Sequence, residues 1–271
     1  MELQQGSYTM RDGKKVVVYT AGNNNDVPIL MIHGLGADHC MWTPQLMSYP
    51  EKGVFCIAPD VRGHGKSEPV EDLSLTDWAK DLNEILDTMG IEKVHVLGVS
   101  MGGVIAQEFA LQYPEKISSL VLCDTFGKLR TMTEKFLGWA IKISYAFFKK
   151  MPRKKMANLL GKGYAFPGGE EGQAYFKEAA YRMDLDQVTQ ARKVINKVDT
   201  EDRLAELDVP SLVMVGDRGG AFFVKMSKRL AQNLNTSLIV IPGSLDPSNL
   251  TGKEYYDKNV LKFIANQKDE R

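Results

Sequence analysis

The segment 98–102, in which Gly98 and Gly102 flank Ser100, is the feature that most limits what this chain can fold into. An apolar run at 94–97 precedes it, and a helix-like run at 103–113 follows it. Glycines around a serine between a strand and a helix indicate a sharp turn, because a Cβ there would collide with the turn. The helix N-terminus also brings a positive dipole end close to the serine. The sequence therefore predicts a strand–turn–helix unit with the serine at its tip.

The rest of the chain alternates between predicted strands and helices. The strands are mostly continuous apolar runs, which are typical of strands covered on both faces, as in a parallel sheet. They are expected at 15–20, 27–32, 54–58, 94–97, 117–124, 209–216 and 236–241. Helices are expected after a cap at Ser74 and over 103–113, 222–233 and 254–265. This alternation predicts an α/β fold with a doubly wound, mostly parallel sheet.

The middle of the chain interrupts the alternation. Residues 126–206 are helix-like and rich in aromatic residues and lysines, which predicts a helical cap inserted into a core formed by 1–125 and 207–271. Within the cap, residues 136–148 are apolar almost all round, and a basic cluster follows them. We favour a cap helix that lines an apolar pocket, with Trp139 and, from the core, Phe222 as binding residues. A helix lying on a membrane surface is the alternative.

The composition argues against several function classes. The chain has 271 residues, and its 34 Lys+Arg equal its 34 Asp+Glu in number. The net charge is therefore zero and does not indicate binding to nucleic acid or to an acidic membrane. Stable membrane insertion is not expected, because no run approaches the roughly 18 apolar residues of a span. The three cysteines have no metal-binding spacing, and no signal peptide is visible, so we expect a cytoplasmic protein without a metal or organic cofactor. The oligomeric state stays open.

Three motifs in this order and spacing resemble the α/β-hydrolase fold with a helical cap. They are His-Gly-Leu-Gly at 33–36, Asp-Val-Arg-Gly-His-Gly-Lys-Ser at 60–67 and Gly-Val-Ser-Met-Gly at 98–102. The resemblance covers nearly the whole chain and implies that Ser100 is the nucleophile. It also implies that the backbone N–H groups of Leu35 and Met101 form an oxyanion hole, with His33 and Gly34 in the adjoining binding loop. Removal of one such donor costs about 3 to 4 kcal/mol of transition-state stabilisation.

The chain departs from the family pattern at two positions. In this fold an acid and then a histidine follow the nucleophile along the chain. The expected acid position holds Gly219, and the expected histidine position holds Asp246. All four histidines precede the nucleophile: His33, His39, His64 and His95. Because a serine hydroxyl needs a base, and a carboxylate with a pKa of about 4 is a poor base at pH 7, the standard triad is absent.

Two aspartates have open interpretations. Asp246 acts as a weak base if it faces Ser100 in an apolar pocket that raises its pKa; otherwise it is a solvated turn residue before Pro247. Asp124 ends a predicted strand where some relatives of the fold place their acid. We expect no role for it, because it has no histidine to orient.

These observations favour a serine-hydrolase-like protein that acts on small esters or related carbonyl compounds. Its activity is expected to be low because the triad is incomplete. The alternative is a non-catalytic member of the same fold that binds a small apolar molecule. In either case a small molecule is the expected partner.

Overall fold

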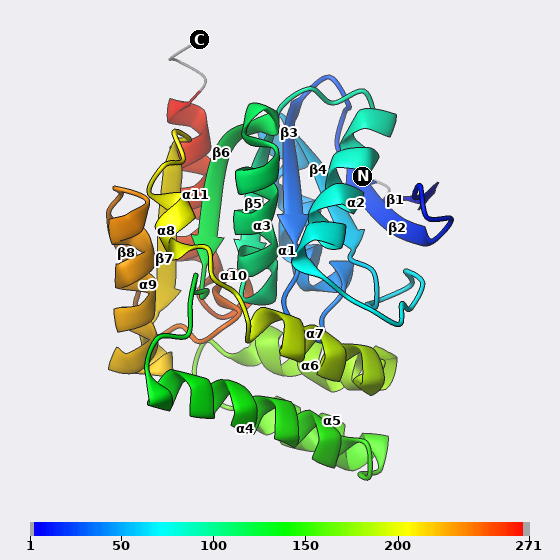
Figure 1. The fold of residues 1–271 in the computed structure, drawn as a ribbon, viewed down its shortest axis with the longest axis vertical. Coiled ribbons are helices and arrows are strands. Elements are labelled where there is room, and N and C mark those ends of the chain that lie inside the picture. The colour runs from blue at the N-terminus through cyan, green and yellow to red at the C-terminus, as the bar shows by residue number, and fades with distance from the viewer. Residues whose placement is uncertain (1–2, 268–271) are drawn as a thin grey trace.

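A computed structural model describes residues 3–267, which form a sheet of eight strands between layers of helices (Figure 1). The strand order is β1-β2-β4-β3-β5-β6-β7-β8. β2 pairs antiparallel with β1 and β4, and all other neighbours are parallel, which confirms the predicted fold class. The strands are β1 (Gln4–Thr9), β2 (Lys15–Ala21), β3 (Val27–Ile32), β4 (Val54–Asp60), β5 (Val94–Val99), β6 (Ile117–Cys123), β7 (Ser211–Gly216) and β8 (Leu238–Ile241).

Strand β1 was not predicted from the sequence. It lies at the sheet edge, where most of its side chains are exposed, and its segment QQGSYT lacks an apolar run. Residues 1 and 2, which belong to the segment in which no signal peptide is expected, lie outside the described residues. Residues 268–271, at the end of the predicted core, also lie outside the described residues.

Helices cover both faces of the sheet and bury one apolar core on each. Trp78 and Leu82 belong to the core on one face, and Trp42 and Tyr256 to the core on the other. The first face carries α2 (Leu75–Thr88), α3 (Met101–Gln112) and α9 (Ala221–Asn233). The second carries α1 (Thr43–Ser48), α10 (Ser248–Thr251) and α11 (Lys253–Asn266). Short 3-10 turns complete the core: His39–Trp42, Pro50–Lys52, Pro114–Lys116 and Asp217–Gly219.

Helix α2 begins where the sequence predicts. The Ser74 side chain accepts a hydrogen bond from the backbone N–H of Asp77, which satisfies one of the free donors of the first turn. The apolar stripe that follows, which includes Trp78 and Leu82, is buried against the sheet.

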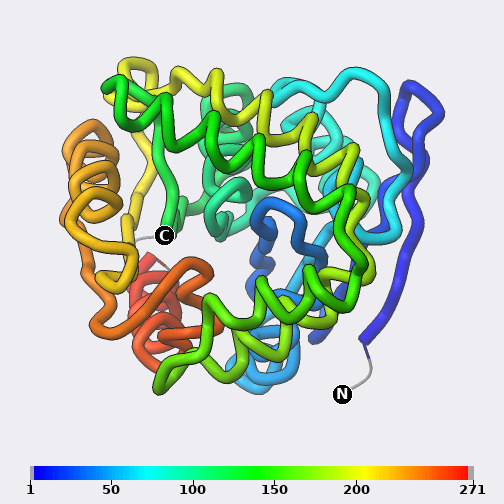
Figure 2. Tube along the Cα trace, turned by 90° about the horizontal axis from the view of Figure 1, so that it is seen from below, coloured from blue at the N-terminus to red at the C-terminus, as the bar shows by residue number. Residues whose placement is uncertain are grey.

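The segment expected to form a cap contains α4 (Met132–Phe148), α5 (Arg153–Lys162), α6 (Glu170–Arg182), α7 (Leu185–Ile195) and α8 (Glu201–Leu204). Helix α4 packs against α7, and α5 packs against α6. The two pairs lie across the carboxyl ends of the parallel strands, and Figure 2 shows them from the cap side. Among the described residues, no helix is both long enough and apolar enough to cross a membrane.

The turn between β5 and α3 holds Ser100 in a strained conformation. Its φ of 57° and ψ of −118° lie in a region that few residues with a side chain adopt. The Ser100 N–H donates to the carbonyl of Cys123 at 2.9 Å, and the Thr125 hydroxyl donates to the Ser100 carbonyl at 2.8 Å. These two bonds tie the turn to the end of β6, so the neighbouring strand fixes where the serine points.

Both flanking glycines are required by close backbone approach. A Cβ on Gly98 would lie 2.5 Å from the Gly102 carbonyl oxygen, and a Cβ on Gly102 would overlap the Ile32 carbonyl oxygen. The sequence prediction of a turn that excludes side chains is therefore confirmed.

We expect Gly102→Ala to lower the free energy of unfolding by about 3 kcal/mol or more, because the added methyl group meets the rigid backbone of β3. Urea denaturation measures the loss. Gly163→Ala is the matched control, since Gly163 has helical φ and ψ of −59° and −22° and a Cβ there would lie 3.3 Å from the Leu160 carbonyl oxygen. Equal stabilities of the two variants would contradict this explanation of the turn.

Candidate active site

Two cavities meet at Ser100 beneath the cap helices. The first has a volume of about 280 Å³ and the second about 220 Å³. The first has a largely apolar wall that includes Phe126, Leu129, Leu137, Phe222, Phe223 and Met226. The second is bordered by Leu35, Met41, Tyr145, Leu160 and Phe176, among others. Five residues line both cavities: Ser100, Ile141, Tyr164, Arg192 and Asp246.

The two expected oxyanion donors lie on either side of Ser100. Leu35, together with Gly34, borders the second cavity, and Met101 is the first residue of α3. In the described part of the chain, the backbone N–H groups of Leu35 and Met101 have no hydrogen-bond acceptor. Both groups are therefore free to bind an oxygen of a ligand.

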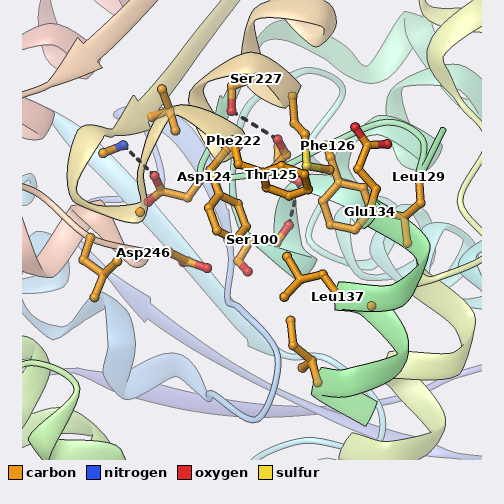
Figure 3. Close-up of a pocket in the computed structure, with 18 of the residues that line it drawn as sticks. Ser100, Asp124, Thr125, Phe126, Leu129, Glu134, Leu137, Phe222, Ser227 and Asp246 are labelled. Carbon is orange, nitrogen blue, oxygen red and sulfur yellow. Dashed lines mark hydrogen bonds between the residues drawn. The ribbon is translucent and has the colours of Figure 1, made fainter. Parts of the chain in front are cut away.

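Asp246 lies directly beside Ser100. It follows β8, and its carboxyl group lies close enough to the Ser100 hydroxyl for that hydroxyl to lower its pKa. The two side chains point toward each other in Figure 3. The Tyr164 hydroxyl donates to the backbone carbonyl of Asp246 at 2.7 Å, which ties the turn after β8 to the cap. Asp246 is therefore held beside Ser100, and it is also exposed to solvent, as expected of a turn residue.

Asp124 lies behind Asp246 at the carboxyl end of β6. Its Oδ1 accepts the N–H of Gly216 at 2.8 Å, and its Oδ2 accepts the N–H of Ser248 at 2.7 Å. Two backbone donors favour the ionised form of a carboxyl group. The backbone of Asp124 also has a positive φ, of 53°, so this residue and Ser100 account for two of the three non-glycine residues with positive φ in the described chain.

The carboxyl groups of Asp246 and Asp124 affect each other's protonation. Burial, and then the negative charge of Asp124, raise the pKa of Asp246 to about 8; the Ser100 hydrogen bond and the Arg192 charge act in the opposite direction. Asp246 lines both cavities, although much of this residue is accessible to solvent. Burial also raises the pKa of Asp124, and its two backbone donors oppose this. Asp246, with a pKa of about 8, therefore holds a proton near neutral pH.

The charge of Asp246 affects the pKa of several neighbouring groups. Its negative form also raises the pKa of Tyr145, Tyr164 and Cys123, each already raised by burial. No histidine lines either cavity within residues 3–267. A carboxyl group with a raised pKa is thus the base nearest to the serine.

His33 and His95 form contacts away from the two cavities. The His33 ring contacts the Gly34 carbonyl at 2.8 Å through Nδ1, and its Nε2 accepts the N–H of Val61 at 3.1 Å. His33 was expected to lie in the binding loop. It supports the loop that carries Leu35, but it lines neither of the two cavities. His95 on β5 bonds with the Ser119 hydroxyl at 2.7 Å.

Trp139 does not enter the site, although it was expected as a binding residue. Its side chain is 51% exposed and contacts Phe136 on the outer face of α4. Leu137 and Ile141 of the same helix face the cavity. A two-residue step turns a helix by about 200°, which places Trp139 opposite Leu137. Phe222, the other expected binding residue of this kind, does line the first cavity.

Asp124, for which no role was expected, lies next to Asp246 and bonds to the turn that carries it. Gly219, at the expected acid position, is part of the first cavity wall. The carboxyl group nearest to Asp246 thus follows β6 and does not come from the loop after β7. The expected histidine is the one member of the arrangement that is missing from the described residues.

One group of side chains elsewhere has the composition of a metal site. Asp38, His39 and Cys40 bring ligand atoms within 4.8 Å of one another. Asp38 is paired with Arg182, and His39 Nδ1 contacts Asp60 at 2.9 Å. These pairs occupy the atoms a metal would need, and the group borders neither cavity next to Ser100.

Comparison with known proteins places the chain in a family. Residues 27–253 match the model of the alpha/beta hydrolase fold family, and the chain belongs to that family. It is 24% identical to 3-oxoadipate enol-lactonase 1 of Acinetobacter baylyi, over 97% of this chain and 96% of the relative. An esterase from Exiguobacterium antarcticum superposes with a TM-score of 0.85 at 23% identity, covering 97% and 100% of the two chains. An enol-lactonase from Burkholderia xenovorans LB400 gives 0.79 at 20% identity, covering 96% and 100%.

The raised pKa of Asp246 predicts a pH-dependent cost to stability. The folded protein keeps this proton up to about pH 8, whereas an unfolded aspartate releases it near about pH 4. The folded state thus binds more protons in this window, so stability falls as pH rises through it. We expect Asp246→Asn to gain stability relative to the parent protein as pH rises from 5 to 9, as measured by urea denaturation.

The control for this experiment is Asp72→Asn, which removes an exposed carboxyl group that lines neither cavity. It should follow the parent protein across the pH range. Parallel pH curves for Asp246→Asn and the parent protein would show that the Asp246 pKa is not raised.

Proposed function

We propose that this chain is a serine hydrolase of small carboxylic esters or related carbonyl compounds, in which Asp246 acts as the base. One observation carries the proposal: the Ser100 hydroxyl faces a carboxyl group whose pKa is raised to about 8. A general base works best when its pKa lies near the operating pH. The environment of Asp246 therefore removes much of the objection that a carboxylate is too weak a base.

The residues support a two-step acyl transfer. The ionised Asp246 carboxylate takes the proton of Ser100 as Oγ attacks the carbonyl carbon, and the N–H groups of Leu35 and Met101 bind the resulting oxyanion. The tetrahedral intermediate collapses, and Asp246 returns the proton to the leaving alkoxide. Water then attacks the acyl-enzyme with the same base, which releases the acid and regenerates Ser100.

Asp124 and the neighbouring backbone position the base. The charge of Asp124 raises the proton affinity of Asp246, and its bonds to Gly216 and Ser248 fix the ends of β7 and of the turn that carries Asp246. A carboxyl base still lacks the second ring nitrogen with which a histidine is oriented. Low turnover at neutral pH is part of the proposal.

Relatives of the chain support this class of reaction. Two of the similar proteins are named as an enol-lactonase and an esterase, and lactones and esters share the acyl–oxygen bond that this site would cleave. The protonation of Asp246 supports a second function below neutral pH. There the carboxyl group cannot accept the serine proton, and the same cavities form a binding site for a small apolar molecule without turnover.

We expect covalent labelling of Ser100 by a fluorophosphonate probe to accelerate as pH rises and to level off above about pH 8, because only ionised Asp246 accepts the proton. Intact-protein mass spectrometry measures the rate. Ser100→Ala should abolish labelling, and Asp246→Asn should lower the rate at pH 9 by at least about tenfold. Asp72→Asn should behave as the parent protein. Absence of labelling at every pH would leave only the binding function.

The position of Asp124 yields a second prediction. Asp246→His alone should complete a serine–histidine–aspartate arrangement and raise kcat/KM for p-nitrophenyl acetate at pH 7 by about 100-fold or more. Adding Asp124→Asn should remove most of the gain.

The matched comparison adds Gly219→Asp to Asp246→His, which places an acid at the usual family position. We expect no further gain, since a Cβ there meets the Phe223 ring at 3.2 Å and Asp124 already serves. A gain that requires Gly219→Asp would contradict the assignment of Asp124.

A further inference from the structure

A cationic side chain lies unpaired in the wall between the two cavities. Arg192 comes from α7 of the cap and is only 8% exposed. Its Nε has no hydrogen-bond partner, and no carboxylate forms an ion pair with it in the described part of the chain. Burial accordingly lowers the pKa of its guanidinium group.

The other buried arginine shows what such a side chain normally requires. Arg62 is 6% exposed and is paired with both Asp81 and Asp12. A buried charge without a partner costs free energy, so proteins rarely retain one that does nothing. Arg192 has five N–H donors and, among the described residues, no protein carboxylate bound to it.

Asp246 does not fill this role. Asp246 forms no ion pair with Arg192 among the described residues, and its ionised form acts on Arg192 only through charge at a distance. The Tyr145 hydroxyl, which lines the second cavity with Arg192, also has no hydrogen-bond partner among the described residues. Arg192 and Tyr145 therefore bring donors without protein partners to the second cavity.

We propose that Arg192 binds a carboxylate of the substrate in the second cavity, so that the substrates of this protein are esters or lactones that carry a carboxylate. A guanidinium group matches a carboxylate with two parallel N–H···O bonds, and the Tyr145 hydroxyl supplies a further donor. Arg192 and Ser100 line the same cavities, so one small molecule spans both groups. This inference rests on the proposed function and specifies its substrate class.

The walls of the first cavity indicate what the uncharged part of the substrate looks like. The first cavity, with Phe126, Phe222 and Met226 in its wall, accepts an apolar group on the other side of the reacting carbonyl. A single charged anchor in an apolar cavity fixes the orientation of a ligand, which is typical of small-molecule sites. Arg192 thus selects and positions the substrate, whereas Ser100 and Asp246 perform the reaction.

The first test measures binding without turnover. Ser100→Ala is titrated calorimetrically with monomethyl glutarate and with methyl valerate, a neutral ester of matched length. We expect the charged ester to bind at least about tenfold more tightly. Arg192→Met in the same background should abolish this preference. Lys193→Met, which removes an exposed positive charge from the same helix, should retain it.

Equal affinity for the two esters in Ser100→Ala, or an undiminished preference after Arg192→Met, would overturn the proposal. Because Ser100→Ala does not react, these outcomes are independent of whether Ser100 and Asp246 catalyse hydrolysis. Failure of the proposed function with retained anion binding would instead describe a binding protein for carboxylate-bearing molecules.

The second test separates substrate binding from a structural role. Removal of an unpaired buried charge should raise the midpoint of urea denaturation of Arg192→Met above that of the parent protein, while anion binding is lost. A lower midpoint with unchanged ester preference would assign Arg192 to the fold and overturn the inference. Arg192→Lys keeps the charge without the paired geometry and should show an intermediate preference, so the test does not depend on one variant.

Discussion

The close approach of the Ser100 hydroxyl and the Asp246 carboxyl is the interaction on which the proposed chemistry of this protein depends. It exists because three distant parts of the chain meet at the carboxyl edge of the sheet: the turn after β5, the end of β6 and the turn after β8. The sheet holds the serine in a strained backbone conformation, and residues of the cap line the cavities beside the base. Strain and burial are both costs to folding, and both serve the site.

Charged side chains from different elements of the fold surround the Ser100–Asp246 pair. Two backbone donors favour the ionised form of Asp124, its charge raises the pKa of Asp246, and Arg192 contributes a positive charge from the cap side. Glu134, which also lines the first cavity, is paired with Arg229, whereas Arg192 has no ion-pair partner among the described residues. An incoming carboxylate would exclude water from Asp246 and raise its pKa further. Substrate charge and the protonation of the base are therefore coupled.

The fold and the turn around Ser100 were predictable from the sequence because their signals are local. Glycines around Ser100, and apolar runs covered on both faces, have few structural solutions. Edge strand β1 escaped prediction because an exposed edge carries no apolar pattern. The direction of Trp139 was missed because a helix that is apolar all round does not show which face is inside.

Only some of the residues at the site could be predicted from the sequence. Asp246 was identified through its place in the family pattern, and its raised pKa was one of two open interpretations. Asp124 was discounted because its partner, Asp246, was not recognised as a base that needs a neighbour. Arg192 gave no signal, since one arginine among many in a cap looks like any solvent-facing residue until its burial is known.

The titration of the Asp246 carboxyl group itself is the decisive measurement. The ¹³Cγ resonance of labelled aspartate, assigned by its absence in Asp246→Asn, reports the protonation state at each pH. We expect a midpoint near about pH 8. A midpoint near about pH 4 would show an ordinary carboxylate beside Ser100 and would contradict the role of Asp246 as a base.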